Sequence, residues 1–165
     1  MKIVFRLVLL AAAAAACVWL WSVLFPGPEK MIRKQLALVA AEASFQAGEN
    51  PLITANRAEN FASRFGTNVE ININVPELGQ HDFVGRPEIT QTVAGLRSKV
   101  SSLKVDFLDV SVTVGPDKQS ATASLTVKAQ TAYDKNFIVQ EMKISFQKVE
   151  GDWLITRVET VRTLS

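Results

Sequence analysis

The apolar and polar positions divide the chain into one long apolar run and a longer region of mixed composition. Apart from Ser22, residues 7–25 are apolar throughout, and Pro26, Gly27 and Pro28 end the run. A helix of nineteen residues is about 28 Å long, close to the ~30 Å hydrocarbon core of a bilayer. The run therefore predicts a single transmembrane helix that is retained as an anchor.

The residues that flank the run fit a membrane interface. Arg6 can extend its side chain to the headgroups, and Trp19 and Trp21 lie near the far end, where indole rings favour the interface. The alternative is a cleaved signal peptide, for which residues 11–16 offer many A-x-A matches. The apolar residues 17–21 continue past these alanines, which favours the uncleaved anchor.

The basic residues at the two ends of the run bear on its orientation. Lys2 and Arg6 favour an amino terminus on the cytoplasmic side. The basic residues after the run favour the opposite orientation, or they contact anionic headgroups; they are Lys30, Arg33 and Lys34. We expect the amino terminus inside. The chain would then be a single-pass protein of the bacterial inner membrane with its domain in the periplasm.

Three amphipathic helices are predicted in the mixed region. The first begins at Pro28 and ends near Gly48, and the second begins after the capping residue Asn50 and runs to Gly66. A loop over residues 76–86 leads to the third. The apolar positions recur at helical spacing, and they are Ile32, Leu36, Val39, Ala43 and Phe45, then Ala58, Phe61 and Phe65, then Ile89, Val93, Leu96 and Val100.

Five segments alternate apolar and polar residues with a period of two, as half-buried strands do. The first covers residues 69–75, and the other four follow the third helix as a meander, with turns at residues 115–118 and 150–152. Leu108 and Val110 are expected to face inward together. The last strand is expected over residues 153–163.

Strands with one polar face, covered on the other by helices, make an α+β layer architecture. We therefore predict an anchor over residues 1–27 and a domain over residues 28–165, in which three helices pack on an antiparallel sheet. Because three helices cannot cover a long twisted sheet flatly, the sheet should curl around them.

This order of elements resembles the nuclear transport factor 2-like superfamily, also called SnoaL-like or cystatin-like cone domains. The matching pieces are the two leading helices, the strand over residues 69–75, residues 83–89 at the start of the third helix, and the closing hairpin over residues 151–155. The resemblance implies a cone with a pocket between sheet and helices, often dimeric through the sheet. Members include isomerases, dehydratases, cyclases, domains that only bind, and membrane-tethered secretion subunits, so the fold alone selects no function.

Composition and charge narrow the choice of partner. Outside residues 1–27, sixteen basic residues balance sixteen acidic ones, which argues against a nucleic-acid binder, since that function needs a basic face. The one cysteine, Cys17, lies inside the apolar run. No metal-ligand spacing or phosphate-cradling glycine cluster is present, and we expect neither metal nor cofactor.

Two pairs of polar residues are weak candidates for chemistry, and we name no catalytic residue. His81 and Asp82 are adjacent and could share a proton, but they are expected to be solvated in the loop. Arg157 and Glu159 form a buried pair if their face lines the cone, and an ordinary surface pair if it points outward. We favour the surface pair, with both side chains exposed to solvent.

Six aromatic residues are candidates for the lining of a pocket, although aromatic residues at such spacing more often belong to the core. They are Phe45, Phe61, Phe65, Phe83, Phe107 and Tyr133. The polar residues of two neighbouring strands, over residues 122–130 and 141–147, make either a solvated face or an interface for a second copy or another protein.

Two functions remain open. The first is a membrane-anchored domain without catalysis that binds a ligand or a protein, as a small accessory subunit of a bacterial membrane complex. The alternative is an isomerase, cyclase or hydrolase acting on an apolar small molecule in the cone. A cavity holding an unpaired acid or base would favour the enzyme.

Overall fold

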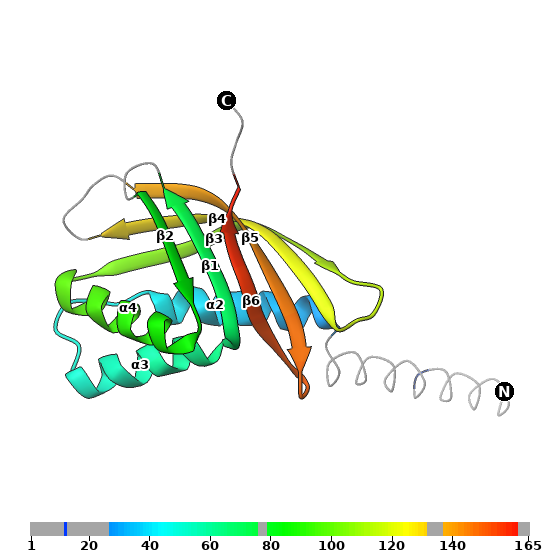
Figure 1. The fold of residues 1–165 in the computed structure, drawn as a ribbon, viewed down its shortest axis with the longest axis horizontal. Coiled ribbons are helices and arrows are strands. Elements are labelled where there is room, and N and C mark those ends of the chain that lie inside the picture. Colours follow the sequence, from blue (N-terminus) through cyan, green and yellow to red (C-terminus); the bar gives the residue numbers. More distant parts are fainter. Residues whose placement is uncertain (1–11, 13–26, 76–78, 132–136, 162–165) are drawn as a thin grey trace, which may run out of the picture.

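The computed structural model describes residue 12 and residues 27–75, 79–131 and 137–161. Three helices and six strands follow one another along the chain (Figure 1). The helices are α2 (Pro28–Ala43), α3 (Pro51–Ser63) and α4 (Arg86–Lys99). The strands are β1 (Phe65–Val75), β2 (Gly79–Val84), β3 (Leu103–Val114), β4 (Ser120–Thr131), β5 (Phe137–Val149) and β6 (Asp152–Thr160).

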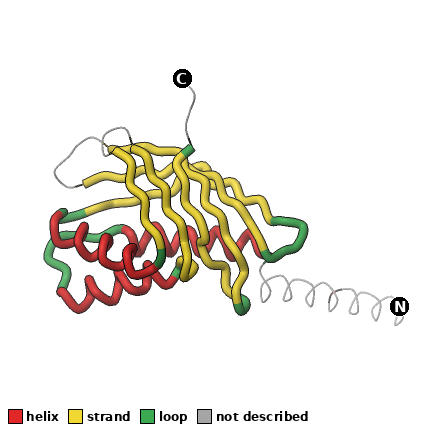
Figure 2. The backbone as a smooth tube through the Cα atoms, in the orientation of Figure 1, coloured by secondary structure: helices red, strands yellow, loops and turns green. Residues whose placement is uncertain are grey.

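The six strands form one curved sheet in the order β2-β1-β6-β5-β4-β3, and the helices lie against its concave side (Figure 2). Neighbouring strands are antiparallel except β1 and β6, which are parallel. The expected α+β architecture of three helices on a curved sheet is confirmed, but the prediction of an antiparallel sheet is wrong for the pair of β1 and β6. The predicted membrane span lies almost wholly outside the described residues, and none of the described helices is long and apolar enough to cross a bilayer.

Local sequence explains where the helices begin. Asn50 caps α3 by accepting a hydrogen bond from the Leu52 amide at 2.9 Å, and each helix has a proline in its first turn, where no intrahelical donor is needed. Before α4, Gly85 has a φ of +83°, a conformation that favours glycine. The Glu88 carboxylate accepts from the Val84 amide at 2.8 Å, which fixes the entry into this helix.

The core lies between the helices and the concave face of the sheet. The core contains Ile32, Leu36 and Val39 of α2 and buried, inward-facing residues of the strands β1, β4, β5 and β6. The edge strands β2 and β3 contribute residues that are only partly buried. In β4 the predicted alternation is observed, with Ala121, Ala123 and Leu125 buried. Burial of this apolar surface is the main force that holds the two layers together.

Two boundaries around the first two helices differ from the prediction. α2 ends at Ala43 instead of Gly48, and Phe45 pairs in extended conformation with Leu103 through two backbone hydrogen bonds of 2.8 and 3.0 Å. Likewise, Phe65 is the first residue of β1, where it pairs with Ile155, and does not end α3. In both places a strand satisfies backbone groups that helical spacing alone assigned to the helix.

The predicted loop before α4 contains the strand β2, in which His81 lies opposite Ile73 and Phe83 opposite Ile71. Leu96 of α4, expected on the packed face, is 42% exposed, whereas Arg97 is buried. Ile89, Val93 and Arg97 follow one another at a spacing of four, so the packed stripe of α4 runs through an arginine.

Two bulges reverse the expected facing of strand residues. In β3 the register shifts between Leu108 and Ser111, and Asp109 has a φ of +52°. Phe107 and Val110 consequently both face the core, while Leu108 is 44% exposed and not buried as expected. In β6 the register shifts at Thr156. The residues after it therefore face the opposite side of the sheet from the one that unbroken alternation would give.

Candidate functional site

An apolar cavity of about 230 Å³ lies inside the cone, between α2, α3, α4 and the concave face of the sheet. Seventeen described residues line it, and sixteen of them have side chains of carbon or carbon and sulfur only. The exception is Thr92 of α4, which is exposed. No ionisable side chain of the described residues lines the cavity.

Four of the aromatic candidates line this cavity. Phe61 of α3 and Phe65 of β1 pack with ring centroids 5.0 Å apart and planes inclined at 51°. Phe83 of β2 and Phe107 of β3 close other parts of the wall. Phe45 does not take part, and Tyr133 lies outside the described residues.

The His81 and Asp82 pair is placed on an edge strand and outside the cavity lining. Both residues are exposed, and as neighbours in a strand they point to opposite faces. The His81 ring stacks on Phe83, with centroids 6.2 Å apart and planes at 9°, and Gln80 donates to the Asp82 carboxylate at 3.0 Å. The expected loop is wrong, but the exposure of both residues agrees with the prediction.

Arg157 and Glu159 lie on the outer face of the sheet, because the bulge at Thr156 separates their face from that of Trp153 and Ile155. The favoured surface position is therefore observed, but among the described residues Arg157 and Glu159 pair with other side chains and not with each other. Arg157 donates to the Glu70 carboxylate, and this hydrogen bond, together with the negative charge of Glu70, raises the pKa of the guanidinium. Glu159 lies 3.5 Å from the Lys143 ammonium group.

The outer face is less uniformly polar than the sequence suggested. Ser124 of β4 is exposed and the Lys128 ammonium lies 4.3 Å from the Phe137 ring centroid. Leu108, Phe137 and Val139 are also exposed here. Self-association or partner binding through this face stays a prediction.

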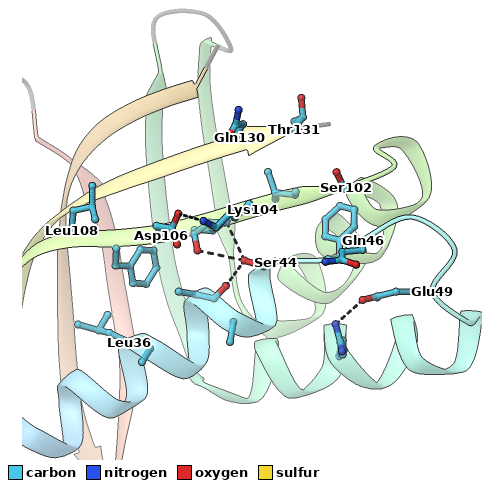
Figure 3. Close-up of a pocket in the computed structure, with 18 of the residues that line it drawn as sticks. Leu36, Ser44, Gln46, Glu49, Ser102, Lys104, Asp106, Leu108, Gln130 and Thr131 are labelled. Carbon is cyan, nitrogen blue, oxygen red and sulfur yellow. Dashed lines mark hydrogen bonds and ion pairs between the residues drawn. The ribbon is translucent and has the colours of Figure 1, made fainter. Parts of the chain in front are cut away.

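A second hollow of about 1290 Å³, which we call the edge groove, runs beside strand β3 (Figure 3). The carboxyl-terminal half of α2 and the segment over residues 44–49 form its other wall. Ser44 bridges the two walls, since its hydroxyl donates to the Ala40 carbonyl at 2.8 Å and accepts from the Val105 amide at 3.0 Å. Lys104 and Asp106 pair at 3.2 Å above it.

Sequence reasoning missed the most buried charged group among the described residues, Arg97. Its guanidinium donates to Glu49 at 3.0 Å and to the Glu42 carbonyl, and it lies 5.0 Å from the Phe45 ring centroid. Burial lowers the pKa of Arg97, although the nearby carboxylate opposes that change. The signal was its position four residues after Val93 on the packed stripe of α4.

Glu49 also pairs with Arg57 of α3 at 2.6 Å, so one carboxylate joins α3 and α4. This cluster is structural in geometry, because both guanidinium groups point at Glu49 and Arg97 also donates to the Glu42 carbonyl, while the buried Nε of Arg97 has no hydrogen-bond partner among the described residues. Within the described residues, no three histidine, cysteine or carboxylate side chains are grouped as metal ligands would be.

Only three of the six residues proposed to face the membrane lie in the described part of the chain. Lys30, Arg33 and Lys34 are exposed on α2, and Arg33 donates to the Val110 carbonyl at 2.7 Å while pairing with Glu29 at 3.0 Å. The remaining candidates, Arg6, Trp19 and Trp21, lie outside the described residues.

No protein-family model and no curated protein matches the sequence. Solved structures match its fold. An NTF2-like protein of unknown function from Pseudomonas putida is 10% identical, with a TM-score of 0.61 over 83% of this chain and 87% of the other. A proposed scytalone dehydratase from Novosphingobium aromaticivorans is 16% identical, with a TM-score of 0.59 over 82% and 84%. An NTF2-like protein with a cystatin-like fold from the same organism is 19% identical, with a TM-score of 0.58 over 89% and 86%.

At these identities the likeness shows the fold alone. The chain has the fold of NTF2-like, or cystatin-like, proteins, and the expected cone architecture is confirmed at that level. Function has to be argued from the cavity and the surfaces of this chain.

Proposed function

We propose that this chain is a membrane-anchored binding domain without a catalytic role, which holds an apolar small molecule in its cone. We place it at the outer surface of a bacterial inner membrane, as a small accessory subunit of a membrane complex. The anchor rests on the apolar run over residues 7–25, and the binding role rests on the cavity. The observation that carries the proposal is the lining of sixteen apolar side chains and Thr92.

The size and chemistry of the cavity define the ligand class. An apolar cavity of about 150 Å³ in another protein accepts benzene, so about 230 Å³ suits a substituted benzene or a short hydrocarbon chain. A charged or strongly polar ligand would lose its hydration without finding a hydrogen-bond partner on the described lining. We therefore propose an uncharged ligand with about ten non-hydrogen atoms.

Acid–base chemistry would need a titratable group that reaches the ligand. The described lining supplies none, which supports binding over turnover. The enzyme alternative keeps one observation in its favour, the contact of His81 with Phe83, which does line the cavity. In that alternative, His81→Gln would abolish turnover of a ligand while leaving its affinity nearly unchanged.

Calorimetric titration of toluene into the full chain in mild detergent tests the binding role. At roughly 0.4–0.8 kcal/mol for each of the seven non-hydrogen atoms of toluene, a Kd on the order of 0.1–10 mM is expected. Val127→Phe, which fills the cavity from β4, should abolish the binding heat. Val149→Phe adds the same bulk at an exposed position of β5 and should leave the binding heat unchanged.

Partition of toluene into the detergent is the same for both variants, so their difference reports the cavity alone. Equal heats for Val127→Phe and Val149→Phe, with both variants folded, would contradict the proposed ligand site.

A further inference from the structure

Two segments that are far apart in the sequence lie side by side at the end of the domain where α2 begins. A hollow of about 480 Å³ lies between the first turn of α2 and the hairpin that joins β3 to β4. Pro28 and Lys30 line it from the helix, and Pro116 and Lys118 line it from the hairpin. In Figure 1 the start of α2 and this hairpin lie at the same end of the molecule.

The hairpin carries Lys118 on a turn that is closed by hydrogen bonds. The Asp117 carboxylate accepts from the Gln119 and Ser120 amides at 3.0 and 3.1 Å and from the Ser120 hydroxyl at 2.9 Å. These bonds lower the pKa of Asp117 and hold its carboxylate toward the turn. A Cβ at Gly115 would overlap the Ser120 hydroxyl, so a larger residue there would displace this hydroxyl from its bond to Asp117.

The uncompensated charge at this end is positive. Lys30 and Lys34, which are four residues apart on α2, are exposed, as is Lys118. Within the described part of the chain none of the three forms an ion pair. Arg33 and Glu29 compensate each other, and the Asp117 carboxylate keeps one negative charge, which leaves a net positive charge from the three lysines.

We propose that Lys30, Lys34 and Lys118 form one surface that binds the anionic phospholipid headgroups of the bilayer, so that the β3–β4 hairpin lies against the membrane. This inference rests on the anchor in the proposed function, because the chain enters the domain beside these lysines at Gly27. Only two residues, Pro26 and Gly27, separate the apolar run from α2, which keeps this end within reach of the headgroups. Each lysine near an anionic surface strengthens its attraction about fivefold.

Fluorescence quenching in vesicles tests the orientation. The full chain carries Cys17→Ser and a fluorophore on Gln119→Cys in the hairpin, and it is reconstituted with lipids that carry a headgroup quencher. Vesicles contain phosphatidylcholine alone or phosphatidylcholine mixed with phosphatidylglycerol. The matched control carries the fluorophore on Ser98→Cys, an exposed position in the last turn of α4.

We expect the hairpin label to be quenched at least about twofold more than the α4 label in the anionic vesicles. Replacing all three lysines by glutamate should remove that difference, while Lys99→Glu on α4 should preserve it. Equal quenching at the two labels, or quenching indifferent to the three substitutions, would overturn the lipid-binding surface. A carbonate wash separates the two ideas: release of the chain refutes the anchor and this surface together, whereas retention with equal quenching refutes the surface alone.

Discussion

Arg97 is the residue whose environment departs most from what its type suggests. Its guanidinium lies between α4, the segment after α2 and the Phe45 ring, and its side chain is 2% exposed. A buried arginine is costly to desolvate, and hydrogen bonds to well-placed acceptors offset that cost. Glu49 and the Glu42 carbonyl supply two of these acceptors.

Arg97→Met should therefore destabilise the domain by about 2 kcal/mol, since Glu49 and the Glu42 carbonyl lose a buried donor while Glu49 keeps Arg57. Urea unfolding of the full chain in mild detergent measures the change. Lys99→Met, exposed two residues later on the same helix, is the matched control and should change the free energy of unfolding by less than about 0.5 kcal/mol. Equal effects of the two substitutions would show that the Arg97 cluster does not stabilise the fold.

Single residues were also where sequence reasoning was weakest. The spacing of Ile89 and Val93 correctly gave the packed face of α4, but the prediction continued that face through Leu96 and did not consider Arg97, since arginine is seldom buried. The pairing with Glu49 that makes Arg97 tolerable depends on a segment almost fifty residues away. No local pattern contains that information.

Among the elements, regular periodicity predicted the helices and the four-strand meander well, and irregular backbone was missed. β2 has a polar sequence, so its pairing with β1 rests on backbone hydrogen bonds that side-chain alternation does not reveal. The sequence does not reveal the bulge at Asp109, because apolar and polar residues alternate there without a break. It allows Phe107 to reach the cavity, where the expected phase would have placed Leu108.

The bulge makes a specific demand on residue 109, whose φ of +52° is tolerated by aspartate far better than by a β-branched residue. Asp109→Val should lower the free energy of unfolding by about 1–2 kcal/mol despite the high strand propensity of valine. Ser111→Val, exposed two residues later in the same strand, should leave it unchanged or raise it slightly. Chemical denaturation of the two variants decides: a stability of Asp109→Val at or above that of Ser111→Val would rule out the bulge.

For the molecule as a whole, layers and curvature followed from the sequence, whereas the cavity did not. Alternation shows which side chains face inward, and that is enough to predict a sheet curled around three helices. Whether those side chains fill the interior depends on how residues from all layers meet. Of the six aromatic candidates, Phe61, Phe65, Phe83 and Phe107 line the cavity, and Phe45 instead supports Arg97.

From the apolar run and the apolar cavity we propose one account of the molecule: a domain held at a membrane, where apolar compounds concentrate, with a cavity that accepts them. The outer sheet face, with Leu108, Phe137 and Val139 exposed, is the surface we propose for a protein partner or a second copy. These roles are compatible, because the cavity and the outer face lie on opposite sides of the sheet.

The most direct measurement of the central claim is a toluene titration of the full chain followed by the methyl NMR signals of residues on both sides of the sheet. Saturable shifts at Met142 and Ile144, which line the cavity, with no shift at Val139 or Leu108 on the outer face, are expected. The same titration of Val127→Phe should leave all four signals unmoved. Shifts that fail to saturate, or that appear equally on both faces, would contradict a ligand-binding cone.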